Sequence, residues 1–248
     1  MIRLVNDNCL NAMKDIPDES VDMILADLPY GIIRNDWDVM IPLAKLWEQY
    51  DRIIKEHGCI ALFGTEKFST KLAASNLKEF RYRWYWEKNN PVGFLNANRM
   101  PLKNIEEINI FYKHLPTYNP VMTKGKPYVT TSHNSSSNYD AKKSHVTIND
   151  GVRFPKQVIH VRNDNMHQVH PTQKPVELLE YLIQTYTNEY DVVLDNTMGS
   201  GSTGVAAINL NRDFIGMEIQ QNYFEIAKDR IKKAITEKVT IASATVNE

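Results

Sequence analysis

Residues 21–31 read VDMILADLPYG, an apolar run that ends in a carboxylate, a proline, an aromatic ring and a glycine. The apolar part, residues 21–26, has the length and composition of a strand buried on both faces. Pro29 cannot donate a hydrogen bond to a sheet and Gly31 relaxes the backbone, so the strand has to end there. Asp27 and Tyr30 therefore follow the carboxyl end of a strand, where open α/β sheets bind their ligands. On its own, such a tetrapeptide is more typical of a structural turn.

Strand-like and helix-like segments alternate on both sides of this stretch. Pro42 and Pro175 each stand at the first position of an amphipathic run, and Gly58 is expected to end the first of these helices. This alternation predicts an α/β fold with a mostly parallel sheet. The expected strands cover residues 2–5, 21–26, 59–63, 80–87, 105–112, 192–195 and 214–218, and the later helices cover 65–77, 175–189, 202–211 and 222–236.

The length and the net charge of the chain limit the classes of protein to which it can belong. The chain has 248 residues and a net charge of −1, so we expect one domain with no global attraction to nucleic acid. Cys9 and Cys59 form neither a disulfide framework nor a metal-binding pair, and the histidines form no ligand set, so no metal is expected. The N-terminus lacks a signal pattern and no apolar run is long enough for a membrane span. These features predict a cytoplasmic protein that does not contact a membrane.

The composition changes between residues 113 and 162. Regular periodicity fades, and the basic side chains are opposed only by Asp140 and Asp150. Such a stretch is either a surface insertion or a basic lobe that contacts nucleic acid. In the second case, the candidates for phosphate contact, which would position the protein without reading sequence, are Lys124, Lys126, Lys142, Lys143, Arg153 and Lys156.

Residues 192–204, VVLDNTMGSGSTG, predict a strand, a glycine turn and a helix in succession. The pattern formally matches a dinucleotide-binding fingerprint, but too few residues follow it for a second Rossmann half. A phosphate-binding P-loop would need a lysine that is not present. S-adenosylmethionine, a cation without phosphate, suits the two acidic strand ends at Asp195 and Glu218. A purely structural turn would leave both acids unexplained.

Two further blocks complete a recognisable order of motifs. HPTQKPVELL at residues 170–179 precedes the glycine turn, and IGME at residues 215–218 follows it. Together with the D-x-P-Y tetrapeptide, these blocks resemble the beta-class amino-methyltransferases of DNA, particularly the adenine-N6 enzymes of bacteria and phages that occur in restriction-modification systems. The resemblance covers roughly residues 1–112 and 166–236. It implies a Rossmann-like S-adenosylmethionine-dependent methyltransferase fold in permuted motif order, with a seven-stranded, mostly parallel sheet, and a single domain over 1–248 with an inserted target-recognition lobe at 113–165.

The resemblance also implies a set of cofactor contacts. Glu218 would bind the ribose of S-adenosylmethionine, and Lys174 would face its carboxylate. Asp7, Asn8 and Cys9 stand where the family contacts the cofactor adenine, and the choice between Asp7 and Asn8 stays open because the usual acidic position holds asparagine. The methionine end would lie near a further group, namely Asp27, Asp195, Gly199, Gly201, Ser202 and Thr203.

The same resemblance assigns the transfer step to the tetrapeptide Asp27, Leu28, Pro29 and Tyr30. The Asp27 carboxylate and the Leu28 carbonyl would accept hydrogen bonds from an exocyclic amine and free its lone pair. Tyr30 would stack on a base flipped out of double-stranded DNA. Aspartate at the head of the tetrapeptide favours adenine N6 over cytosine N4. The alternatives are a cytosine-N4 enzyme and a catalytically silent regulator that binds DNA or the cofactor. Homodimers are common in the family.

Overall fold

The computed structural model describes residues 1–31, 40–132, 145–163 and 173–245. The chain divides into two compact units, one formed by Met1–Asn119 and Gln157–Glu248 and the other by Pro120–Lys156. Of the residues singled out in the sequence, Lys142, Lys143 and the first three residues of the HPTQKP block lie outside the described part. Among the described residues, no helix combines the length and apolar character needed to cross a bilayer.

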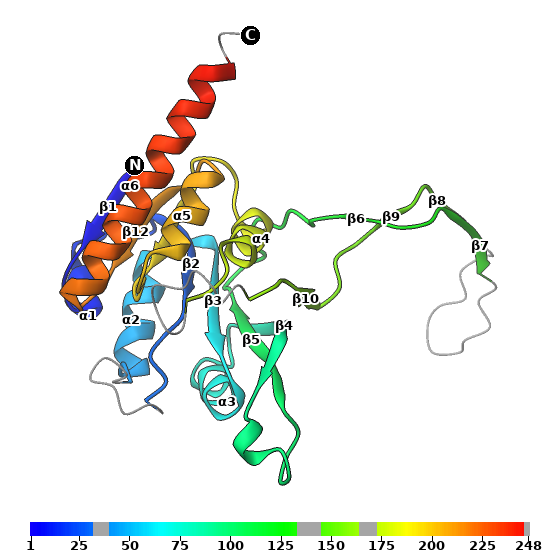
Figure 1. Ribbon diagram of the computed structural model, residues 1–248, viewed down its shortest axis with the longest axis horizontal. Helices are drawn as coiled ribbons and strands as arrows, with labels where there is room; N and C mark the ends of the chain where they lie inside the picture. The colour runs from blue at the N-terminus through cyan, green and yellow to red at the C-terminus, as the bar shows by residue number, and fades with distance from the viewer. Residues whose placement is uncertain (32–39, 133–144, 164–172, 246–248) are drawn as a thin grey trace. The chain divides into compact units, whose positions relative to one another are not determined.

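The larger unit is built on one sheet (Figure 1). In the described residues the sheet has eight strands in the order β1-β12-β11-β2-β3-β5-β4-β10. Only β5 runs antiparallel to its two neighbours, while every other adjacent pair is parallel. In sheet order the strands span Ile2–Val5, Asp213–Met217, Val192–Asp195, Val21–Ala26, Ile54–Gly64, Lys103–Phe111, Phe80–Val92 and Val158–His160.

Two apolar clusters fill the two faces of this sheet, because the buried strands present alternate residues to each side. In β2, Met23 and Leu25 belong to one cluster and Ile24 and Ala26 to the other. The first cluster packs against α4 (Val176–Tyr186), α5 (Ser202–Asn209) and α6 (Gln221–Thr245). The second packs against α1 (Cys9–Ala12), α2 (Leu43–Ile53) and α3 (Glu66–Ser75). Short 3-10 turns, η1 and η2, cover Met13–Asp15 and Phe94–Asn96.

The mostly parallel α/β fold predicted from the sequence is confirmed, although several elements differ from the expected ones. Seven strands correspond to the expected ones, and β10 adds an eighth at the edge beside β4. The closing helix α6 continues to Thr245, beyond the expected end near residue 236.

The prediction that Gly58 ends a helix is wrong, because α2 ends at Ile53 and Gly58 lies inside β3. The register with β2 jumps from the pair Val21–Ile54 to the pair Met23–Cys59, so extra residues bulge from β3 here. A Cβ on Gly58 would lie 2.6 Å from the Ile54 side chain. The glycine therefore makes room for a bulge, which is a common role of glycine within strands.

Two short antiparallel ribbons form the part of the smaller unit that the structure describes. The strands β6 (Thr123–Lys124) and β9 (Val152–Arg153) form one, and β7 (Tyr128–Ser132) and β8 (His145–Asn149) form the other. The Arg153 guanidinium joins them, since it donates hydrogen bonds to the Asn149 side chain and the Lys126 carbonyl. Its central carbon also lies 4.6 Å from the centre of the Tyr128 ring.

Candidate active site

Two acidic residues meet at one edge of the sheet. The strands β2 and β11 are parallel neighbours, with Leu194 beside Ile24. Asp27 directly follows β2, and Asp195 is the last residue of β11, so both carboxylates reach the same edge. The Thr197 hydroxyl, in the turn after β11, donates a hydrogen bond of 3.1 Å to the Asp27 carbonyl and ties the two strand ends together.

These strand ends open into a cavity of about 870 Å³ in the larger unit. That volume lies in the range of pockets that enclose a cofactor-sized ligand, about 300–1,000 Å³. Most of the site residues predicted from the sequence line it, namely Asp7, Asn8, Cys9, Asp27, Leu28, Pro29, Tyr30, Lys174, Asp195, Gly199, Ser202, Thr203 and Glu218. Below, the wall formed by Asp27, Tyr30, Lys174 and Glu106 is called the β2 side, and the wall formed by Asp195, Gly199, Thr203 and Glu218 is called the β11 side.

Asp27 is the centre of the β2 side. The Tyr30 hydroxyl donates a hydrogen bond of 2.8 Å to Asp27 Oδ1, and Lys174 Nζ lies 2.6 Å from Oδ2. Burial raises the pKa of Asp27 above its ordinary value, while the Lys174 ammonium opposes that rise. The Tyr30 ring packs on Phe68, with ring centres 4.5 Å apart. Leu28 is 3% exposed as a whole residue, packs in the core and lines the cavity.

A second carboxylate, Glu106 of β5, holds the same lysine. Lys174 Nζ lies 2.6 Å from Glu106 Oε1, and Lys88 Nζ lies 2.6 Å from Glu106 Oε2. Burial alone would raise the pKa of Glu106, but the two ammonium groups hold it below its ordinary value. Burial would lower the pKa of Lys174, but Asp27 and Glu106 outweigh it and raise that pKa above its ordinary value. The β2 side thus contains a chain of alternating charges.

Asp195 on the β11 side is held by neutral groups. Its Oδ2 accepts a hydrogen bond of 2.6 Å from the Thr203 hydroxyl, and its Oδ1 accepts one of 3.1 Å from the Thr197 backbone N–H. Burial raises the pKa of Asp195 to about 7. Among the described residues, no lysine or arginine forms an ion pair with this carboxylate.

Glu218 closes the β11 side at the end of β12. Its carboxylate accepts hydrogen bonds from the backbone N–H groups of Gly199, at 3.0 Å, and Gln220, at 2.8 Å. Burial raises the pKa of Glu218. Gly199 adopts a φ of 51°, a left-handed conformation that glycine adopts readily, so its N–H can turn toward the acid.

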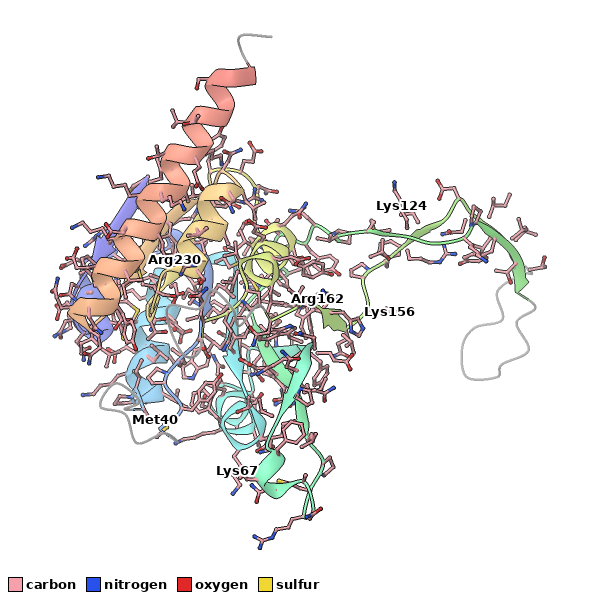
Figure 2. The ribbon with its side chains drawn as sticks, in the orientation of Figure 1. Met40, Lys67, Lys124, Lys156, Arg162 and Arg230 are labelled. Carbon is pink, nitrogen blue, oxygen red and sulfur yellow. The ribbon has the colours of Figure 1, made fainter. Side chains whose placement is uncertain are left out.

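The other two glycines of the turn serve helix packing. Gly201 does not line the cavity, and a Cβ on it would lie 2.9 Å from the Ala227 Cβ of α6. A Cβ on Gly204 would lie 2.5 Å from the Ile231 side chain of the same helix. The Arg230 guanidinium, also on α6, donates a hydrogen bond of 2.6 Å to the Ser200 carbonyl (Figure 2). The close approach of α5 and α6 therefore fixes the turn.

The N-terminal residues predicted to contact a cofactor lie at the start of α1. The Asn8 side chain caps this helix, accepting a hydrogen bond of 2.9 Å from the Leu10 N–H, while Asp7 accepts one of 2.6 Å from the Asn8 N–H. Cys9 is buried beside Asn196, and burial raises the pKa of its thiol. Asn196 Oδ1 accepts a hydrogen bond of 2.6 Å from Tyr50, whereas its Nδ2 finds no acceptor among the described residues. Asn196 lines the cavity, and its side chain opposes the rise in the pKa of the Cys9 thiol.

A sequence model described as DNA methylase, of the N6/N4 type, matches residues 21–229. The chain belongs to this family. It is 27% identical to the type II methyltransferase M.HpaI of Haemophilus parainfluenzae over 242 residues, covering 92% of this chain and 74% of that protein. It is 25% identical to the type II methyltransferase M.HinfI of Haemophilus influenzae, covering 93% of this chain and 68% of that protein.

Solved structures of DNA methylases share the fold. The crystal structure of the M1.HpyAVI–SAM complex is 26% identical, with a TM-score of 0.65 over 93% of this chain and 100% of that chain. The PvuII DNA methyltransferase, described as cytosine-N4-specific, has a TM-score of 0.67 over 95% of this chain and 90% of that chain, at 14% identity. The Rossmann-like methyltransferase fold expected from the sequence is confirmed.

Sequence reasoning missed several residues of this DNA methylase site. Glu106 and Lys88 stand in strands whose letters read as ordinary amphipathic sequence, and Arg230 stands on the exposed-looking face of a helix. For Glu106, a signal was available in the alternation of the strand, because Glu106 shares one face with Ile108 and Ile110 and is the charged residue of that row. The candidates for phosphate contact lie in the smaller unit, where Lys124, Lys126 and Lys156 are exposed and Arg153 is held by internal contacts. No cluster of three or more potential metal ligands occurs among the described residues.

Proposed function

We propose that this DNA methyltransferase transfers a methyl group to the N6 amine of an adenine flipped out of double-stranded DNA. The observation that carries the proposal is the placement of Asp27 and Tyr30 in the same cavity as the acidic β11 side. One wall offers an acceptor and an aromatic ring to a base, and the other offers carboxylates to the cofactor. A structural turn or a silent regulator would not need both.

S-adenosylmethionine is the cofactor, and the residues of the β11 side fit it. Two buried carboxylates without a cationic partner among the described residues suit a ligand that carries positive charge. Asp195 would hold its amino acid end, Glu218 its ribose hydroxyls, and Asn196 Nδ2 provides an additional donor. When bound, the cofactor supplies a methyl group activated on a sulfonium. Asp7 suits the adenine amino group better than Asn8, because Asp7 has a second carboxylate oxygen besides the one bonded to the Asn8 N–H, whereas the single side-chain oxygen of Asn8 caps α1.

The β2 side would activate the amine. The lone pair of an exocyclic adenine amine is delocalised into the ring, so acceptors on its two hydrogens are needed to free it. The Asp27 carboxylate and the Leu28 carbonyl would be these acceptors, and the carboxylate would also stabilise the positive charge that develops on nitrogen. Tyr30 fixes one Asp27 oxygen by its hydrogen bond and would stack on the base, an interaction typically worth about 1–3 kcal/mol.

Cytosine N4 is the second candidate acceptor. The similarity in fold to the PvuII enzyme, described as cytosine-N4-specific, favours it. Against it, aspartate at the head of the tetrapeptide is the residue expected for adenine. Mass spectrometry of nucleosides from DNA treated with the protein, with Asp27→Ala as the blank, distinguishes them. We expect N6-methyladenine, and N4-methylcytosine as the sole product would overturn the adenine assignment.

We also propose that the inserted region 113–165, which includes the smaller unit, is the target-recognition lobe. Lys124, Lys126 and Lys156 are exposed on it and suit contact with phosphates, and Lys142 and Lys143 are candidates from their sequence. Figure 2 labels Lys124 and Lys156. Replacing both Lys124 and Lys126 by glutamine should weaken DNA binding and reduce the slope of log Kd against log salt by about two, roughly one for each lost contact. Lys232→Gln on the exposed face of α6 is the control. An unchanged slope in the double variant would move the phosphate contacts elsewhere.

A further inference from the structure

Glu106 is a carboxylate in a place where the sheet is otherwise apolar. Along β5 it shares one face with Ile108 and Ile110, which belong to the core. Its side chain is only 5% exposed. Burying a charge costs free energy unless it is paired, and a well-packed apolar residue would usually stabilise such a position at least as well. The position of Glu106 therefore calls for a role beyond stability.

The register of the sheet places both of its partners. Trp86 of β4 pairs with Glu106 across the β4–β5 ladder, and Lys88 lies two residues further along β4, on the same face. Lys88 Nζ lies 5.2 Å from the centre of the Trp86 ring, and Lys174 Nζ lies 5.0 Å from the centre of the Phe63 ring. An ammonium over an aromatic face gains a further attraction. Each lysine is therefore held both by an acid and by a ring.

These contacts make one chain of four charges, Asp27, Lys174, Glu106 and Lys88, with each adjacent pair 2.6 Å apart. A Lys174–Asp27 pair alone would already be neutral. Glu106 adds a negative charge that competes with Asp27 for the Lys174 ammonium, and Lys88 restores the balance. Because Glu106 shares the positive charge of Lys174, the Asp27 carboxylate keeps more of its negative charge. That charge is what the amine would contact.

We propose that Glu106 and Lys88 are positioning residues of the transfer reaction: Glu106 holds Lys174 between two carboxylates so that Asp27 remains a strong acceptor for the incoming amine, and Lys88 holds Glu106. The inference rests on the proposed function, because it concerns the carboxylate that meets the base. Lys174 is the residue through which Glu106 acts on Asp27, because its ammonium donates a hydrogen bond to Asp27 Oδ2 and forms an ion pair with Glu106 Oε1.

The charged and titratable groups that face Asp27 act in opposite directions on its pKa. The Lys174 ammonium and the Tyr30 hydroxyl lower it, and Glu106 raises it. Asp195 on β11 also interacts with Asp27 as a like charge, and Glu218 lies beyond Asp195. Removing the charge of Glu106 should therefore lower the pKa of Asp27. Removing the charge of Lys88 takes away one of the two ammonium partners of Glu106 and should raise the pKa of Asp27.

The test compares Glu106→Gln and Lys88→Gln in single-turnover methylation at saturating cofactor and DNA, measured against pH. We expect the acid limb of the rate profile to move to lower pH in Glu106→Gln and to higher pH in Lys88→Gln, by about one unit each. The plateau rate should fall in Glu106→Gln, because Asp27 becomes a weaker acceptor. The double variant, in which the net charge of the cluster is again zero, should return the limb close to its original position.

Glu107→Gln is the matched control, because Glu107 is the next residue of the same strand and lies on its opposite face, 3.7 Å from Arg83. A second readout needs no activity: the side-chain carboxyl ¹³C shift of Asp27, assigned with Asp27→Asn, reports its titration directly. Cofactor affinity from calorimetry should stay within about threefold in all variants, which separates positioning of Asp27 from loss of the cofactor site.

The inference would be overturned if the acid limb of the rate profile moved in the same direction in Glu106→Gln and Lys88→Gln. It would also be overturned if the limb moved no further in these variants than in Glu107→Gln. These outcomes require a wild-type enzyme that forms N6-methyladenine, so they are distinguishable from failure of the proposed function, in which the wild type forms none. If Glu106→Gln does not fold, as judged by circular dichroism, Lys88→Gln still gives the test, because Lys88 is 19% exposed and tolerates a polar replacement.

Discussion

The two walls of the cavity each present an aspartate at the end of neighbouring parallel strands, half-buried Asp27 and buried Asp195, yet their charge environments differ. On the β2 side, Asp27 contacts the Lys174 ammonium at 2.6 Å. On the β11 side, Asp195 accepts hydrogen bonds only from neutral groups within the part of the chain that the structure describes, at Thr203 and Thr197. Burial raises the pKa of both carboxylates, to about 7 for Asp195. The two sides differ because Asp27 has a cationic partner, whereas Asp195 has none among the described residues.

This difference in charge bears on where the cofactor and the proposed base would bind in the cavity. A wall whose charges are already balanced suits a neutral group such as the amine of a base. A wall with unbalanced negative charge suits a ligand that brings a cation, as the methyl donor does. Under the proposed function, the charge pattern therefore places the base at the β2 side and the methyl donor at the β11 side.

The largest effect should come from the β2 side. Asp27→Asn keeps the shape of the side chain but removes the charge that stabilises the developing cation on the amine. We expect the single-turnover rate to fall roughly 10²- to 10³-fold at saturating cofactor, while cofactor affinity changes little. Asp18→Asn, at an exposed ion pair with Arg52, is the control. A variant that transfers at the normal rate would remove Asp27 from the mechanism.

A smaller effect, on binding, should come from the β11 side. Asp195→Asn retains an acceptor for Thr203 but loses the negative charge. We expect cofactor affinity to fall roughly tenfold to hundredfold, as for the loss of one charged hydrogen bond of about 1.5–3 kcal/mol. The rate at saturating cofactor should change much less, and calorimetry combined with single-turnover kinetics measures both. If the saturated rate fell as far as in Asp27→Asn, the two walls would not have separate roles.

The smallest effect should come from the glycine turn, which supports the β11 side from behind. Gly201 adopts a φ of 79°, and a Cβ there would press on Ala227 of α6. Gly201→Ala should lower the free energy of unfolding by about 1–3 kcal/mol, through backbone strain and overpacking. Gly93→Ala is a matched control, because Gly93 has a φ of 97° but no atom within 4 Å of its would-be Cβ. Equal destabilisation of the two variants in thermal melts would show that helix packing does not fix the turn.

The sequence predicted those parts of the fold and the site that depend on residues close together in the chain. The apolar run of residues 21–26 and the strand and glycine turn of residues 192–201 lie where their patterns indicated, and they bring Asp27 and Asp195 together. The bulge around Gly58 was not predictable, because a glycine after a helical pattern reads as a stop signal. Only pairing with β2 shows that it belongs to β3.

The charge chain of the β2 side was not predictable for a related reason. It joins residues from four separate segments, and Glu106 meets Lys174 only because β5 is inserted antiparallel between β3 and β4. The family resemblance predicted that Lys174 contacts the carboxylate of the cofactor, whereas in the structure Lys174 bridges Asp27 and Glu106. The role of Gly201 likewise depends on α6, which is distant in sequence and packs directly on the turn.

The most direct test of the difference between the two walls is the proton released when the cofactor binds. The pKa of Asp195 is about 7 in the free protein, so near pH 6.5 a large fraction of this acid is protonated. A cationic ligand favours the ionised acid, so binding should release a proton and affinity should weaken as pH falls below 7. Calorimetry of S-adenosylmethionine binding in buffers of different ionisation enthalpy measures this release. We expect release in the wild type and in Asp27→Asn but markedly less in Asp195→Asn. Equal release in Asp195→Asn and the wild type would show that Asp195 does not provide the negative charge that the cofactor meets.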